Sequence, residues 1–190
     1  MTDQTQTQLA SGRELKFIRV HVSETPYWEY VTRTNSAEGV TIVAVTLDRK
    51  IILVKQKRIP LDKYVIELPA GLVADKDSTE TPVQAVMKEL LEETGYKVEL
   101  EKIRPLARGT ALPGLTNEIN TLYLASDVIK SEVAEGGGDP DEGEDIEVLE
   151  VPLNSVMDKL TAFEEEGYVV DLKIFAGLLF LLEAQGRKAQ

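Results

Sequence analysis

Short apolar runs separated by polar turn residues recur over much of the chain. β-Branched and aromatic runs of this kind, bounded by turn residues, predict strands, and the polar Asp48–Lys50 between two of them predicts a hairpin. The predicted strands are Leu15–Val22, Tyr27–Arg33, Gly39–Leu47, Ile51–Lys57, Tyr64–Leu68, Lys97–Gly109, Ile119–Ser126 and Ile146–Val151.

One helix carries clear start and stop signals. Thr81 suits the N-cap, Pro82 the first helical position, and Gln84 completes a capping box, while Gly95 supplies the stop. Apolar residues recur within this segment at helical spacing, so one of its faces should pack on the core. The residues expected on that face are Val83, Val86, Met87 and Leu90.

Two later segments, Asn154–Thr161 and Asp171–Ala184, are also predicted helices, and the acidic, glycine-rich stretch Glu132–Asp145 before them is predicted to be a mobile loop. The packing face expected for the last helix is Leu172, Phe175, Ala176, Leu179 and Leu182. Strands and helices mix without a regular βαβ alternation, which favours an α+β fold with a mixed sheet.

Composition restricts the chemistry available to this chain. Its 190 residues include no cysteine, and His21 is the single histidine, which we interpret as structural. Thiolate sites, His-rich zinc sites and cysteine nucleophiles are therefore excluded, and a bound metal would be a hard ion held by oxygens. The 33 acidic and 21 basic residues give a net charge of -12, which argues against general nucleic-acid binding.

The first residues, Met1–Gly12, are rich in Thr and Gln and are predicted to be a disordered tail. They lack the order of a signal peptide, and no apolar run is long enough for a membrane span. We therefore expect a soluble, cytoplasmic protein that contacts no membrane.

Three glutamates cluster on the capped helix. Glu89, Glu92 and Glu93 are spaced i, i+3 and i+4, which places Glu89 and Glu93 side by side. Like charges at this spacing, near a helix C-terminus, are destabilising unless a cation bridges them. A solvated acidic stripe is the simpler alternative. Lys88 can pair with Glu92 on the outer side, which would leave Glu89 and Glu93 for a divalent ion such as Mg²⁺.

The segment Gly71–Tyr96 resembles the Nudix box, G-x5-E-x7-R-E-U-x-E-E-x-G-U. The spacing from Glu80 to Gly95 matches throughout. There are two departures: the loop between Gly71 and Glu80 is three residues longer than the pattern, and Lys88 stands where the family has arginine. Lysine is expected to brace the glutamates less rigidly, but every box carboxylate is present.

The resemblance extends to the ADP-ribose pyrophosphatase branch of that family, through Gln56–Pro60, Glu67–Gly71, Leu112–Thr116 and the Asp-Leu-Lys opening of the last helix. It implies a Nudix α/β/α sandwich around a mixed β-sheet, with an N-terminal antiparallel β region exchanged across a homodimer. The domains it implies are a tail at 1–12, the β region at 13–38 and a Nudix hydrolase domain at 39–190.

The same resemblance implies the metal site. Glu89 and Glu93 would bind Mg²⁺, or Mn²⁺, together with the Ala70 backbone carbonyl. Glu92 would be a further or supporting ligand, and Glu80 would support the cluster.

The resemblance also implies the base and the substrate contacts. The general base would come from an acidic loop, where we choose Glu144, with Glu142 and Glu147 as alternatives; a merely solvated loop is the simpler interpretation. Substrate contacts would come from Arg58 and Arg33 at the diphosphate, Trp28 at the base and Leu115 on the sugar side. Trp28 would otherwise be a core or interface aromatic.

The function implied is Mg²⁺-dependent hydrolysis of the pyrophosphate bond of nucleoside diphosphate sugars, ADP-ribose first and GDP-mannose next. Two alternatives stay open: hydrolysis of dinucleoside polyphosphates or another nucleotide, and a non-catalytic nucleotide-sensing domain.

Overall fold

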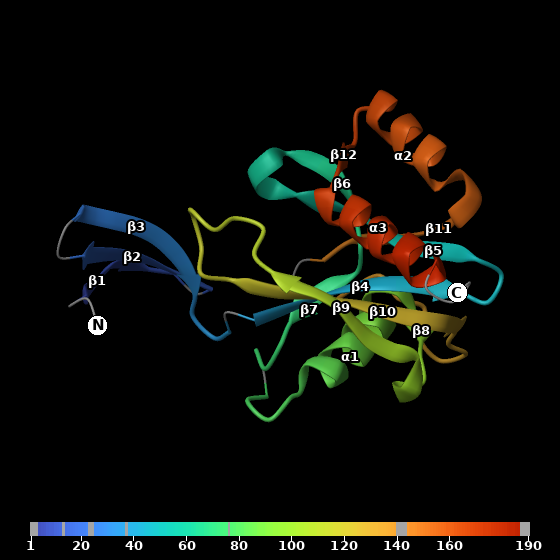
Figure 1. Cartoon of the computed structure of the whole chain (residues 1–190), viewed down its shortest axis with the longest axis horizontal. Coiled ribbons are helices and arrows are strands. Elements are labelled where there is room, and N and C mark those ends of the chain that lie inside the picture. The colour runs from blue at the N-terminus through green and yellow to red at the C-terminus, as the bar shows by residue number, and fades with distance from the viewer. Residues whose placement is uncertain are drawn as a thin grey trace.

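The computed structural model describes residues 4–12, 14–22, 25–36, 38–75, 77–139 and 144–186. Figure 1 shows a central sheet covered by helices on both faces, with a small separate sheet projecting from one end. The small sheet is antiparallel, in the order β1-β2-β3, and contains both strands predicted before Arg33. None of the helices in the described ranges is long and apolar enough to cross a membrane.

The central sheet is mixed. Its strands follow the order β12-β6-β5-β4-β10-β8, with β11 paired to β5, β7 to β4 and β9 to β10. The β4–β10 and β6–β12 pairs are parallel and the other pairs are antiparallel. The elements are β1 (Gln4–Ser11), β2 (Leu15–Val22), β3 (Thr25–Arg33), β4 (Glu38–Thr46), β5 (Lys50–Arg58), β6 (Lys63–Glu67), β7 (Ala70–Leu72), α1 (Pro82–Thr94), β8 (Tyr96–Lys97), β9 (Ile103–Gly109), β10 (Ile119–Lys130), β11 (Ile146–Pro152), α2 (Val156–Glu165), β12 (Val169–Val170) and α3 (Leu172–Gly186), with short 3-10 turns η1 (Ile59–Leu61), η2 (Leu100–Lys102) and η4 (Leu153–Ser155).

Alternation along β4 builds two apolar layers. Ile42 and Ala44 point into a cluster with α1, whereas Val43 and Val45 point into a cluster with α2 and α3. All four side chains are buried because both faces of this strand are covered, as Figure 1 shows with α1 below the sheet and α2 and α3 above it. The predicted α/β/α sandwich around a mixed sheet is confirmed.

Helix α1 forms as its caps predict. Thr81 and Gln84 make both hydrogen bonds of the capping box, and Gly95 ends the helix in the left-handed conformation, with φ 67°. Val86 and Leu90 are fully buried, but Met87 is 39% exposed, so its predicted place in the core is wrong. Ala85 is buried instead, because the face of the helix that packs on the sheet includes Ala85, Val86 and Leu90 and leaves Met87 at its edge.

The predicted packing face of α3 is also wrong at most of its positions, although Phe175 packs against the core as predicted. Ile174 and Leu181 are buried, whereas Leu172, Leu179 and Leu182 are 79%, 61% and 67% exposed. The helix is apolar around most of its circumference, so periodicity does not select a face. The buried face is instead determined by the close packing of α3 on the sheet at Gly177, where a Cβ would lie 2.8 Å from a methyl group of Val43.

Two other predicted segments need correction. The tail at 1–12 is not wholly irregular, because Gln4–Ser11 forms β1 against β2. Backbone pairing with β2 adds this edge strand, the described side chains from Gln6 to Ser11 are exposed, and Gln6 also donates to the Tyr30 hydroxyl. The single strand predicted at Lys97–Gly109 is divided into β8, η2 and β9. The assignment of 13–38 and 39–190 to separate units stays a prediction.

Candidate active site

A cleft of about 840 Å³ opens where β4, β7 and β10 meet α1 and the base of the N-terminal sheet. Five of the predicted site residues line it: Arg33, Arg58, Ala70, Glu89 and Glu144. They come from five separate parts of the chain, so the fold brings together what sequence spacing alone does not. A second hollow, of about 600 Å³, lies against α2 and α3 and is lined mainly by apolar side chains.

Glu93 is the most buried carboxylate of the cluster. It is 6% exposed, and its Oε2 accepts a hydrogen bond of 3.1 Å from the Ala70 backbone N–H. Burial, together with the nearby charges of Glu89 and Glu144, raises the pKa of Glu93 to about 8 against the opposing effects of that hydrogen bond and of Arg58. A buried carboxylate with so little compensation is suited to a cation.

Glu89 lies against the backbone of β7. A Cβ at Gly71 would fall 2.1 Å from the Glu89 carboxyl carbon, so only glycine leaves room for this side chain. Burial raises the pKa of Glu89 to about 7, although the adjacent Lys88 lowers it. The motif therefore opens with glycine because the side chain of Glu89, eighteen positions later, occupies the space that a Cβ at Gly71 would need.

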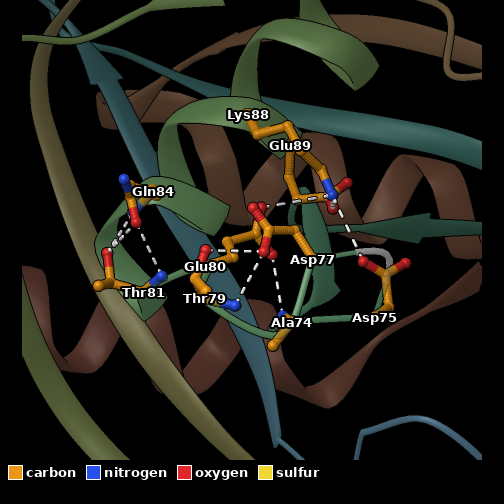
Figure 2. Close-up of polar contacts among 9 residues, drawn as sticks. All are labelled: Ala74, Asp75, Asp77, Thr79, Glu80, Thr81, Gln84, Lys88 and Glu89. Carbon is orange, nitrogen blue, oxygen red and sulfur yellow. Dashed lines mark hydrogen bonds and ion pairs between the residues drawn. The ribbon is translucent and has the colours of Figure 1, made fainter.

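Lys88 holds three carboxylates together, as Figure 2 shows. Its Nζ lies 3.2 Å from Glu89 Oε1 and 3.6 Å from both Glu80 Oε1 and Asp75 Oδ1. Partial burial opposes the charged ammonium, but these three carboxylates outweigh it and raise the pKa of Lys88. Glu80 also accepts a hydrogen bond of 2.9 Å from the Ala74 N–H. The lysine at this position thus braces the cluster together with Asp75 from the longer loop.

Glu92 does not pair with Lys88, so that predicted pair is wrong. Lys88 extends toward Glu80 and Asp75 because two carboxylates there offer more favourable charge than Glu92 alone. Glu92 is half-buried, and it is not among the described residues that line the cleft.

The loop that carries Glu144 is fixed to the end of α1. The N–H of Gly137 donates to the carbonyl of Glu93 at 2.9 Å, and that of Gly138 donates to the carbonyl of Glu92 at 3.1 Å. At Gly136, with φ 84°, a Cβ would lie 2.5 Å from the Thr94 carbonyl carbon. The glycines that predicted a mobile loop therefore allow its backbone to approach the helix.

Glu144 projects into the cleft from this loop. Its Oε2 accepts a hydrogen bond of 2.9 Å from the Asp139 N–H, and its charge acts on both Glu93 and Arg58. The alternative Glu147 lies on β11, forms an ion pair with Lys55 and is not among the residues described as lining the cleft. The other alternative, Glu142, lies outside the described residues.

Arg58 lies in the cleft and is already oriented by a carboxylate. Its Nε and one terminal nitrogen donate to the two oxygens of Glu67 at 2.7 Å and 2.6 Å. Those hydrogen bonds raise the pKa of Arg58 despite partial burial. About half of the side chain remains exposed, so its other nitrogens can meet an anion from the cleft.

The N-terminal sheet contacts the far end of the cleft. Arg33 donates to Glu118 at 2.6 Å, and the Val31 N–H donates to the Leu115 carbonyl at 2.8 Å. Trp28 is 58% exposed, which rules out a core position for it within this chain, and Leu115 is 52% exposed. Neither side chain is among the described residues that line the cleft.

Several cleft residues were not identified from the sequence. Thr41 and Asn120 lie on strands whose other residues are mostly apolar. Glu118 can be identified as a cleft residue only from the structure, where it accepts a hydrogen bond from Arg33. Lys173 lies in the Asp-Leu-Lys opening of α3, where its ammonium pairs with Asp171. The available signal was a polar residue at a core-facing position of a strand, as for Thr41 and Asn120.

The donor set fits a hard divalent cation. Within the described ranges, no three acidic side chains converge closely enough to form a ready-made metal cage. Instead Glu89 rests in the space left by Gly71, and Lys88 supplies its countercharge, while Glu93 remains buried with one backbone donor. Carboxylate oxygens are the ligands that such an ion prefers; Glu89 lines the cleft, and Glu93, which is not among the described lining residues, contacts the lining residue Ala70.

Comparisons with known proteins agree with this arrangement. A family model described as NUDIX domain matches residues 36–172. The mouse protein named ADP-sugar pyrophosphatase is 33% identical, over 94% of this chain and 86% of its own length. The ADP-ribose pyrophosphatase of Bacillus subtilis (strain 168) is 34% identical, over 80% of this chain and 76% of its own. A solved structure titled as an ADP compounds hydrolase superposes with a TM-score of 0.72 at 20% identity, covering 98% of this chain and 95% of that one.

Proposed function

This chain belongs to the Nudix family of hydrolases, and from that premise we propose that it hydrolyses the pyrophosphate bond of nucleoside diphosphate sugars. ADP-ribose is the first candidate substrate and GDP-mannose the next, and the products are a nucleoside monophosphate and a sugar phosphate. The observation that carries the proposal is the meeting of Glu89, Glu144 and Arg58 in one cleft. Relatives named for ADP-sugar and ADP-ribose pyrophosphatase activity support the substrate class.

Enzymes of this family need a divalent metal, and we propose Mg²⁺, or Mn²⁺ in its place, held by Glu89, Glu93 and the Ala70 carbonyl with support from Glu92. When bound, such an ion supplies positive charge to the pyrophosphate oxygens and lowers the pKa of the attacking water. Lys88 keeps Glu89 in place through the contact of 3.2 Å, and Glu93 is held by the Ala70 N–H.

Glu144 is the proposed general base. It accepts a proton from the water as the water oxygen attacks one phosphorus, and the bond from that phosphorus to the bridging oxygen breaks. The other phosphate leaves with that oxygen. The hydrogen bonds from Gly137 and Gly138 to the end of α1 support this role, because they hold the start of the loop that carries Glu144 beside Glu93.

Arg58 and Arg33 are the proposed diphosphate contacts, Trp28 stacks on the base, and Leu115 lies on the sugar side. In a homodimer that exchanges residues 13–38, the Trp28 of one chain would lie at the cleft of the other chain. The exposed apolar side chains of the small sheet support a partner: Leu15, Tyr27 and Trp28 are 47%, 52% and 58% exposed. Analytical ultracentrifugation tests it, and a monomer at micromolar concentration would contradict it. A cytoplasmic location remains part of the proposal.

A substrate panel tests the activity. ADP-ribose, GDP-mannose and a dinucleoside polyphosphate are incubated with protein and Mg²⁺, and phosphate is measured after phosphatase treatment. We expect release from the sugar nucleotides, which present monoesters to the phosphatase only after cleavage. Intact ADP-ribose and GDP-mannose beside a cleaved dinucleoside polyphosphate would overturn the substrate class, and no cleavage with retained binding would favour the sensing alternative.

A further inference from the structure

Thr41 and Asn120 interrupt an apolar stripe on the sheet face beneath α3. Along β4 the side chain next to Thr41 on this face is Val43, and along β10 the one next to Asn120 is Leu122, and both belong to the buried cluster. Thr41 is itself fully buried. A buried hydroxyl costs free energy unless it is hydrogen bonded, and its partner Asn120 is only half-buried, so the pair places a polar group at the surface of the cleft.

The hydroxyl of Thr41 fixes the orientation of the Asn120 carboxamide. Thr41 Oγ1 donates to Asn120 Oδ1 at 2.7 Å, which leaves the two N–H groups of Nδ2 on the other side. Nδ2 lies over Gly39, where a Cβ would come within 2.7 Å of it and 3.4 Å of the Gly71 carbonyl oxygen. Among the described residues, no hydrogen bond uses Nδ2. All four residues line the cleft.

We propose that Asn120 is a substrate-contacting residue whose Nδ2 donates to an oxygen of the nucleoside diphosphate sugar, and that Thr41 is the positioning residue for its amide. The inference rests on the proposed function. It follows from placement: Gly71 lies next to both the Asn120 amide and the Glu89 carboxylate, so a diphosphate held through a cation at Glu89 would have its oxygens on the side of the amide. The amide is a neutral donor, and either an anionic phosphate oxygen or a sugar hydroxyl oxygen can accept its hydrogen bond.

Steady-state kinetics on ADP-ribose test the donor. Asn120→Asp keeps the shape but replaces the donor by an anion, and we expect KM to rise at least about tenfold with kcat altered less than about threefold. Asn120→Ala should raise KM about tenfold. Asn154→Asp is the matched control, because Asn154 is exposed outside the cleft and the charge change is the same. Thermal unfolding establishes that each variant is folded.

Two further variants test the geometry. Thr41→Val removes the hydroxyl at nearly constant volume and should raise KM. Thr41→Ser keeps a hydroxyl and should have a KM near that of the wild type. If Thr41 had only a structural role, Thr41→Val would lower the unfolding temperature without changing KM and kcat differently. Gly39→Ala displaces the unaltered Asn120 amide and should raise KM as well. Inhibition by AMP and by ribose 5-phosphate then shows which half of the substrate the amide contacts, since only that product should bind Asn120→Asp more weakly.

The outcomes separate this inference from the proposed function. Wild-type kinetics in both Asn120 variants, with ADP-ribose cleaved normally, would overturn the role of Asn120 and leave the activity standing. Wild-type protein that neither binds nor cleaves ADP-ribose or GDP-mannose would overturn both. Equal weakening in Asn154→Asp would attribute the effect to net charge and also contradict the role of Asn120.

Discussion

Removing the charge of Glu93 should stabilise the metal-free protein while it abolishes turnover. Glu93 is 6% exposed, and among the described residues its carboxylate has one hydrogen-bond donor, the Ala70 N–H at 3.1 Å. Glutamine at this position is neutral, keeps nearly the same shape and still offers an oxygen to that donor. The substitution Glu93→Gln therefore removes the burial of a charge without breaking the hydrogen bond.

The magnitude follows from the pKa of Glu93, which burial raises from 4.5 to about 8. At about 1.36 kcal/mol per pKa unit, ionising this group costs the folded state at most about 5 kcal/mol relative to the unfolded chain. Water entry and local relaxation reduce the penalty, so we expect about 1–3 kcal/mol at pH 8. Because the folded state binds more protons than the unfolded state between the two pKa values, wild-type stability falls as pH rises from 4.5 to about 8.

Urea unfolding in chelator at pH 5 and pH 8 measures this difference. Glu93→Gln should be more stable than wild type at pH 8, and the gap should narrow toward pH 5, where Glu93 is protonated in the folded state. Glu166→Gln is the control, because Glu166 is exposed, and it should change stability by no more than about 0.5 kcal/mol. Turnover with Mg²⁺ should fall at least about 100-fold in Glu93→Gln. Equal or lower stability of Glu93→Gln at pH 8 would refute the reasoning.

Three further predictions concern other parts of the site. Glu144→Gln should lower kcat by about 10²–10⁴-fold at nearly constant KM, whereas Glu147→Gln should leave kcat unchanged; equal losses would remove Glu144 as the base. Gly71→Ala places a Cβ 2.1 Å from the Glu89 carboxyl carbon, so it should displace that ligand and lower kcat/KM about 100-fold, and a wild-type value would contradict this contact. Trp28→Ala should weaken ADP-ribose binding by about 1–3 kcal/mol in calorimetry, and unchanged affinity would exclude base stacking.

The sequence predicts a helix or strand correctly where residues within that element specify its ends. Helix α1 could be predicted because Thr81, Gln84 and Gly95 specify its ends independently of any neighbour. The packing face of α3 could not, because its apolar residues surround the helix and the choice depends on the fit of Gly177 against Val43. Periodicity reports that a helix is buried on some face, and it identifies the face only when the other side is polar.

The site shows the same division. The carboxylates of the motif could be identified from spacing, since they lie on one helix. Glu144 and Glu147 could not be distinguished along the sequence; the strand pairing of β11 with β5 separates them, because it places Glu147 beside Lys55. Asn120 was missed because its role depends on Thr41, which lies 79 residues earlier in the chain.

The end of α1 connects the proposed metal ligands with the proposed base. A helix leaves its last carbonyls without intrahelical donors, and here the Gly137 and Gly138 N–H groups satisfy those of Glu93 and Glu92. The residues whose side chains would bind the ion therefore fix, through their own backbones, the loop that carries Glu144. This geometry explains why glycine is required at Gly136, where a Cβ would meet the Thr94 carbonyl carbon at 2.5 Å. Because the Gly137 and Gly138 N–H groups bond to the end of α1, a shift of α1 would move this part of the backbone together with the proposed ligands.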